Sequence, residues 1–286
     1  MIFSVLLDLD NVCGLNELLH EGSADEFAQL VPTSATLAGL VELGALAETS
    51  PDRKHRELLT QFVERQSARW PVLKNISHAF QNAQAKPNSV LDMHATPDQE
   101  VWALADKHSI TDNQFTLYLL RFERSLKAAG FPAKFATAVA AAFSEMADNV
   151  IQHSGSSQFR VAGVAGFRVA QGAMNYVVTD VGQGALSKLK ATTKWASLNS
   201  ERDALIAIGR DGATSRPLKC GSGYFHVFES FLDRRGSVKM RSGEGLAHLT
   251  GNLNMRHAEG ANTQYFTGFR VFVSCSLNDE GSELVC

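Results

Sequence analysis

The chain contains 286 residues, carries a formal net charge of −3 at pH 7 and is 44% hydrophobic. This balance argues against a nonspecific nucleic-acid binder, which relies on net positive charge. The hydrophobic content is sufficient for a substantial core, and because the length exceeds that of a typical single domain, we expect two domains.

The cysteines indicate a reducing compartment. Cys13, Cys220, Cys275 and Cys286 are scattered without the spacing of a zinc site or a disulfide framework. Residues 1–12 are too short and too acidic for a signal peptide, and no apolar run approaches the roughly 18 residues that a membrane span needs. We expect a soluble cytoplasmic protein that makes no use of a membrane.

The N-terminal region predicts a separate, smaller domain. Residues 1–12 have the apolar pattern of a strand, and Thr33 or Ser34 is expected to cap an apolar helix. The polar, proline-containing segment near residues 82–100 marks the domain boundary. We therefore assign residues 1–95 to a mainly helical or α/β interaction or sensory domain.

Two helices are expected next, over residues 110–130 and 131–152. Thr111 or Asp112 is a capping signal for the first helix, and Pro132 is compatible with the first turn of the second. Both segments have the helical spacing of apolar residues.

The second of these helices carries a polar stripe, because Glu145, Asn149 and His153 recur at four-residue spacing on one face. Beside a magnesium-bound triphosphate, Asn149 can offer a neutral oxygen to Mg²⁺, and Glu145 can order or deprotonate an attacking group. The alternative is the solvated face of an amphipathic helix, and the downstream motifs favour the functional interpretation.

Residues 159–180 predict two strands joined by a turn at Gln171–Gly172, and the second strand ends at Asp180. An aspartate there can accept a hydrogen bond from the amino group of a purine. Gly182 and Gly184 let the backbone approach a flat ring closely. Taken alone, this spacing also fits an ordinary loop.

A third motif precedes another helical pattern and comprises Gly221, Ser222 and Gly223. Backbone N–H groups at a glycine-rich helix start bind phosphate well. Arg216 lies just upstream, in a polar, proline-containing loop that can fold over a nucleotide.

Two further strand-like segments, residues 236–245 and 268–277, bring the total to at least four strands behind a layer of helices. This pattern predicts an α+β fold in the form of a two-layer α/β sandwich. We assign residues 105–280 to this second domain.

The order and spacing of the three motifs resemble the GHKL ATPase superfamily, which includes gyrase, MutL, ninety-kilodalton heat-shock chaperones, sensor histidine kinases and anti-sigma-factor serine kinases. The resemblance covers roughly residues 105–275 and implies the Bergerat ATP-binding fold. The matching positions are Glu145, Asn149 and His153 in the N box, Asp180, Gly182 and Gly184 in the first glycine box, and Gly221 and Gly223 in the second.

The resemblance implies ATP and Mg²⁺ as cofactors. Asn149 would ligate the metal, Asp180 would hold the adenine amino group, and Glu145 would be the catalytic residue. A lid would cover the nucleotide over roughly residues 185–220. The other residues implied for the nucleotide site are His153, Gly182, Gly184, Arg216, Gly221, Ser222, Gly223 and Thr267.

The chain departs from the family pattern at two positions. Phe225 stands where the second glycine box commonly has a third glycine, which puts hydrolysis in doubt more than adenine binding. Thr267 is the nearest match to a late-strand threonine that supports the adenine, but its order with Gly268 is reversed.

The sequence argues against a sensor histidine kinase, because His55 and His78 lack the sequence motif that surrounds a phosphoacceptor histidine. The chaperone, gyrase and mismatch-repair classes carry long transducer domains after the ATPase domain, which this sequence does not contain. Small bacterial ATP-binding proteins of the anti-sigma type are the most similar class.

In the N-terminal region, a strand followed by Pro-Thr-Ser-Ala and an apolar helix is similar to the STAS-like modules that accompany such kinases. A plain helical interaction or dimerisation domain is the alternative.

Two functions follow. The first is a Mg²⁺-dependent ATPase or protein serine/threonine kinase of the anti-sigma switch type, in which Glu145 orients the acceptor hydroxyl. The second is a nucleotide-gated protein-binding module with little or no catalysis. For both we expect ATP and a protein partner, a regulator or phosphoacceptor, and no nucleic-acid partner. Both are compatible with a homodimer.

Overall fold

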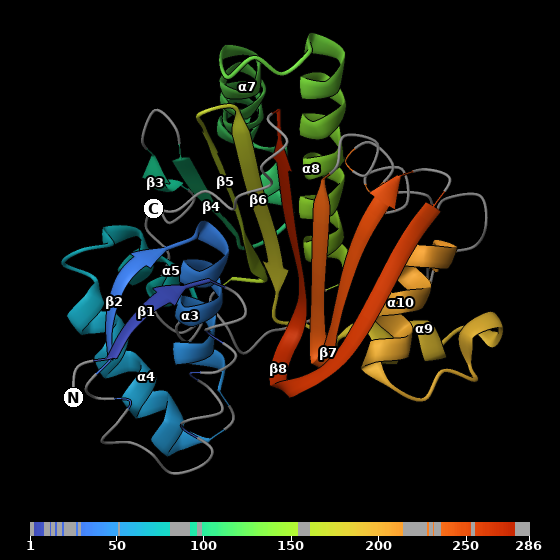
Figure 1. The fold of residues 1–286 in the computed structure, drawn as a ribbon, viewed down its shortest axis with the longest axis horizontal. Coiled ribbons are helices and arrows are strands. Elements are labelled where there is room, and N and C mark those ends of the chain that lie inside the picture. Colours follow the sequence, from blue (N-terminus) through green and yellow to red (C-terminus); the bar gives the residue numbers. More distant parts are fainter. Residues whose placement is uncertain are drawn as a thin grey trace.

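The computed structural model is mixed α+β, which confirms the expected α+β class (Figure 1). No helix in the described part of the chain is both long and apolar enough to cross a membrane. The structure describes residues 3–8, 30–50, 52–80, 92–95, 99–153, 161–213, 236–252 and 255–277, and the single positions 12, 15, 19, 27, 228 and 231.

A six-stranded sheet forms the centre of the molecule, in the order β3-β4-β5-β6-β8-β7, and each neighbouring pair is antiparallel. The turn between β5 and β6 lies at Gln171 and Gly172, as predicted, and both residues have positive φ. The first two strands of the sheet, β3 and β4, precede residue 105, where the sequence analysis places the start of the second domain. The strands are β3 (Asp92–Ala95), β4 (Gln99–Leu104), β5 (Gly163–Ala170), β6 (Ala173–Asp180), β7 (Ser237–Asn252) and β8 (Met255–Ser276).

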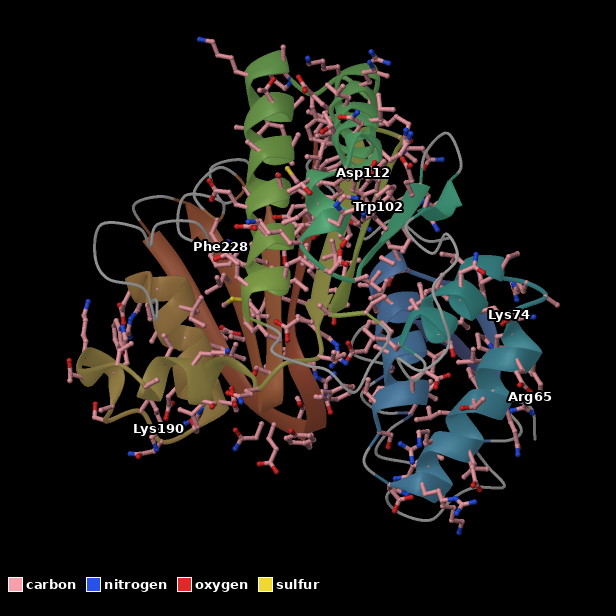
Figure 2. All side chains as sticks on the ribbon, turned by 180° about the vertical axis from the view of Figure 1, so that it is seen from behind. Arg65, Lys74, Trp102, Asp112, Lys190 and Phe228 are labelled. Atoms are coloured by element: carbon pink, nitrogen blue, oxygen red, sulfur yellow. The ribbon has the colours of Figure 1, made fainter. Side chains whose placement is uncertain are left out.

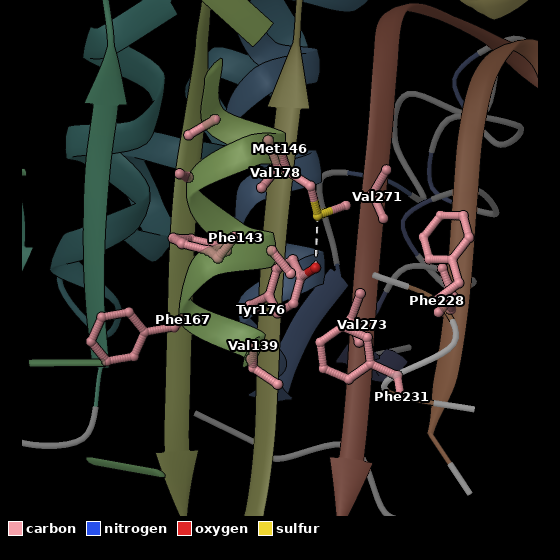
Figure 3. Close-up of a cluster of buried hydrophobic side chains, with 14 of the residues drawn as sticks. Val139, Phe143, Met146, Phe167, Tyr176, Val178, Phe228, Phe231, Val271 and Val273 are labelled. Carbon is pink, nitrogen blue, oxygen red and sulfur yellow. Dashed lines mark hydrogen bonds between the residues drawn. The ribbon is translucent and has the colours of Figure 1, made fainter. Parts of the chain in front are cut away.

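One face of the sheet is covered by α7 (Asn113–Ala128) and α8 (Ala133–His153), with the short α6 (His108–Thr111) before them. Asp112 caps α7 by accepting a hydrogen bond from the amide of Gln114, as the sequence predicts. In α8 the buried residues Phe143, Met146, Ala147 and Val150 recur at helical spacing. Figure 3 shows this face of the core, where the hydroxyl of Tyr176 donates to Sδ of Met146.

The opposite face is covered by the N-terminal segment. It contains β1 (Phe3–Leu7) and β2 (Leu30–Ala35), which pair in parallel, and the helices α3 (Leu37–Thr49), α4 (Arg53–Gln66) and α5 (Pro71–Phe80). Thr36 caps α3 by accepting from the amide of Gly39, so the helix begins slightly later than the predicted caps Thr33 and Ser34. Because α3 is buried almost all round, it joins the N-terminal segment to the sheet through one shared core.

The last two strands form a ribbon that doubles back on itself (Figure 1). Ser237 and His248 belong to the same strand, β7, yet Oγ of Ser237 lies 2.6 Å from Nε2 of His248. An extended strand of this length would separate them by roughly 30 Å or more, so β7 must turn. The turn coincides with the register shifts between Ser242 and Gly245, and Gly243 has a φ of +52°.

Candidate nucleotide site

The carboxylate of Asp180 ends β6 in a buried position, with the residue only 8% exposed. Its Oδ1 atom accepts hydrogen bonds from the amides of Gly182, at 2.7 Å, and Phe269, at 3.1 Å. The other oxygen, Oδ2, accepts no hydrogen bond from the described residues. The backbone therefore holds one oxygen in place, and the second is available to a donor such as an amino group.

Burial controls the protonation of this carboxyl. Removal from water raises the pKa of Asp180 to about 6, although the amides of Gly182 and Phe269 and the positive charges of Arg270 and Lys188 act in the opposite direction. The carboxyl is therefore largely ionised at neutral pH and becomes protonated in mild acid. An ionised oxygen is a stronger acceptor for an amino group than a neutral one.

Gly268 allows β8 to approach the backbone of Asp180 closely. A Cβ atom at this glycine would lie 2.0 Å from the carbonyl oxygen of Asp180, and its φ of +87° also favours glycine. The neighbouring Thr267 donates its hydroxyl to the carbonyl of Thr49 in α3, at 3.4 Å. The threonine assigned to the adenine thus contacts the N-terminal segment.

A second close approach brings the end of α8 to the same place. Gly163 pairs with Asp180 across the sheet, and a Cβ at Gly163 would lie 2.7 Å from Cγ1 of Val150. Since Asn149 immediately precedes Val150, the turn of α8 that carries Asn149 lies beside the strand position that pairs with Asp180. Asn149 is half-buried.

The other two residues of the stripe differ in their placement. Glu145 is exposed, one turn of α8 before Asn149. His153 is the last residue of α8, and its side chain lies outside the described part of the structure. Of the two described members of the stripe, Asn149 is the one next to Val150, which approaches the strand position that pairs with Asp180.

The loop after Asp180 is built around Gly184, whose φ of +82° lies in the left-handed region. It leads into α9 (Ala185–Lys190), whose first amides are already occupied: Ser242 Oγ accepts from Ala185 at 2.8 Å, and Glu201 Oε2 accepts from Leu186 at 3.0 Å. Sequence analysis did not identify Ser242 or Glu201. Ser242 lies next to a visible signal, since it precedes Gly243 and Gly245 in the strand-like segment at residues 236–245.

The stretch expected as a lid is helical over much of its length. After α9 it contains a 3₁₀ turn (Thr193–Trp195) and α10 (Glu201–Asp211), which ends at Gly212 in the left-handed conformation. Helix α10 packs on the β7–β8 ribbon, where Gly209 has no room for a Cβ beside Leu249. The predicted phosphate residues Arg216, Gly221, Ser222 and Gly223, together with Phe225, lie outside the described residues.

Within the described residues, no group of three or more His, Cys, Asp or Glu side chains could hold a metal ion. In proteins, Mg²⁺ is commonly held by one or two side-chain oxygens together with oxygens of a bound nucleotide. The amide of Asn149 is a suitable oxygen donor for this purpose. Comparisons of the chain with models of protein families, with curated proteins and with solved structures found no match.

Proposed function

We propose that the chain is an ATP-binding signalling protein whose nucleotide site resembles that of the GHKL superfamily and whose fold is of the Bergerat type. The observation that carries the proposal is the buried carboxylate of Asp180, with Oδ1 held by two backbone amides and Oδ2 open to a donor. A purine amino group is the donor that such a site would select, because a guanine presents a carbonyl oxygen at the corresponding ring position and would meet a carboxylate of like polarity.

Further support comes from the elements around this carboxylate. The end of α8 with Asn149 approaches the strand that pairs with Asp180, so a metal-binding amide and a purine-binding carboxylate would lie on the same side of the sheet. Lys188 on α9 adds a positive charge that acts on Asp180. A triphosphate extending from the purine would be stabilised by such a charge.

In the first version of this function, the protein is a Mg²⁺-dependent ATPase or serine/threonine kinase acting on a protein partner. Glu145 is exposed and could therefore meet a water molecule or the hydroxyl of a docked partner. Magnesium would supply charge neutralisation on the phosphates. In the second version, ATP binding gates a partner surface and turnover is slow, because Phe225 replaces a glycine of the family pattern.

Two measurements test the proposal and separate its versions. Competition of ATP and GTP against a fluorescent ATP analogue tests the purine assignment, and equal competition by the two nucleotides would contradict it. Phosphate release from ATP by wild type and by Phe225→Gly separates the versions. A large rise in release in the variant supports the gated binder, whereas fast release by wild type supports the enzyme.

A further inference from the structure

Behind the candidate nucleotide site lies a buried cluster of charges that joins the N-terminal segment to the sheet. Glu42 of α3 is fully buried between Arg241 of β7 and Arg270 of β8, which are also buried. Its Oε1 atom lies 3.4 Å from Nη1 of Arg241, and its Oε2 atom lies 3.1 Å from Nε of Arg270. One carboxylate thus contacts two guanidinium groups.

The cluster depends on Glu42, because a buried charge without a counter-charge is strongly unfavourable. Arg241 has additional support, since it lies over the ring of Phe266 at 3.2 Å from the centroid and donates to Oγ1 of Thr263. Arg270 is farther from this ring, at 5.1 Å. Both arginines therefore share Glu42 as an ion-pair partner.

Arg270 in turn contacts the strand that ends at Asp180. Its Nε donates to Oγ1 of Thr179, the residue before Asp180, at 3.2 Å. The preceding residue of β8, Phe269, donates its amide to the Asp180 carboxylate on the other face. Two consecutive residues of β8 therefore connect Glu42 on one side of the sheet with Asp180 on the other.

We propose that Glu42 positions Asp180 through Arg270 and Thr179, so that helix α3 of the N-terminal segment sets the affinity of the nucleotide site. This inference rests on the proposed function. Glu42, Arg270 and Thr179 are positioning residues, since the Asp180 carboxylate accepts its hydrogen bonds from the amides of Gly182 and Phe269 instead. A partner or ligand that displaces α3 would lower nucleotide affinity, and by linkage nucleotide binding would tighten the contact of α3 with the sheet.

The test uses the full chain and measures displacement of a fluorescent ATP analogue by ATP and by GTP. Glu42→Gln and Thr179→Val remove the two links, and Glu48→Gln is the matched control, because Glu48 lies on the same helix but accepts a hydrogen bond from Ser77 of the N-terminal segment. We expect the first two variants to lose about tenfold in ATP affinity, because the Asp180 carboxylate is held less well in place. The ratio of their affinities for ATP and GTP should decrease. The control should have the ATP and GTP affinities of wild type.

If Glu42→Gln fails to fold, Thr179→Val still tests the inference. Thr179→Val leaves the Glu42–Arg270 pair in place and changes the side chain little in shape, so it decides the question alone. Wild-type ATP affinity and wild-type preference in a cooperatively melting Thr179→Val protein would overturn the inference while leaving the proposed function standing. Absence of ATP binding by the wild-type chain would overturn both.

Amide hydrogen exchange separates coupling from a purely structural role, because a structural role would not make the exchange of α3 depend on ATP. If α3 and the nucleotide site are coupled, saturating ATP with Mg²⁺ should slow exchange of the α3 amides in wild type and should slow it much less in Thr179→Val. Unchanged exchange of α3 in ATP-saturated wild type would contradict the coupling.

Discussion

The amide of Phe269 donates a hydrogen bond of 3.1 Å to Oδ1 of Asp180, so the last strand of the sheet fixes the carboxylate at the end of β6. The bond is possible because Gly268 brings β8 against the backbone of Asp180 without a side chain between them. The central carboxylate of the candidate site is therefore positioned by a residue almost ninety positions later in the chain.

The raised pKa of Asp180 predicts a pH-dependent stability. The pKa is about 6 in the folded chain and lower in the unfolded chain, so the folded state retains the proton of Asp180 up to a higher pH. The stabilisation relative to an unperturbed aspartate is full below about pH 4 and is lost as pH rises through 6, which amounts to about 3 kcal/mol. Urea denaturation at pH 4.5 and 7.5 should show about 2 kcal/mol of this loss in wild type, since part of it has already occurred at pH 4.5, and should not show it in Asp180→Asn. An equal pH dependence in the two proteins would contradict the assignment.

Asn149→Ala should remove the Mg²⁺ dependence of ATP affinity, because the amide oxygen is the candidate protein ligand of the metal. The side chain is only half-buried, so the melting temperature should change little. Calorimetric titration with ATP, with and without Mg²⁺, checks the expectation. Gln152→Ala, an exposed neighbour on the same helix, is the control and should behave as wild type. An Asn149→Ala protein that keeps its Mg²⁺ dependence would remove this residue from the site.

Glu145→Ala should retain ATP binding and lose turnover. Glu145 is exposed, so its removal costs little stability, and its proposed role is limited to orienting or deprotonating the attacking group. Steady-state phosphate release and ATP affinity are measured on the same preparation. Glu64→Ala, exposed on α4, serves as the control. Normal turnover in Glu145→Ala would leave this residue without a catalytic role.

Two glycines of β5 offer a matched test of the packing beneath the site. A Cβ at Gly163 would lie 1.9 Å from the carbonyl oxygen of Thr179, whereas the nearest atom to a Cβ at Gly166 is 3.4 Å away. Gly163→Ala should lower the free energy of unfolding by about 1 to 3 kcal/mol or more, because the backbone must shift. Gly166→Ala should be tolerated. Chemical denaturation checks both, and similar stabilities of the two variants would show that the strand is less tightly packed than described.

Local sequence signals predicted much of the helical and strand content. The capping residue Asp112, the turn at Gln171–Gly172 and the strand end at Asp180 are all found where the sequence indicates them. Each depends on interactions within a few residues, so a single segment contains the information. The polar stripe of α8 is likewise set by helical periodicity alone.

Long-range features could not be predicted in this way. The contact between Glu42 and Arg270 joins residues 228 positions apart, and the cap on α9 comes from Ser242, 57 residues beyond Ala185. The fold-back of the β7–β8 ribbon also has no local signature beyond its glycines. Such features depend on how elements pack, and an apolar helix such as α3 does not reveal which charge it will meet.

A calorimetric titration of the full chain with ATP in the presence of Mg²⁺, repeated with Asp180→Asn, is the decisive measurement. We expect micromolar binding by wild type that weakens without Mg²⁺. In Asp180→Asn the amide can still accept the two backbone hydrogen bonds at one oxygen but presents a donor to the purine, so binding should fall at least about tenfold in a folded protein. Absence of binding by wild type at millimolar ATP, or equal affinity of the two proteins, would contradict a nucleotide site at Asp180.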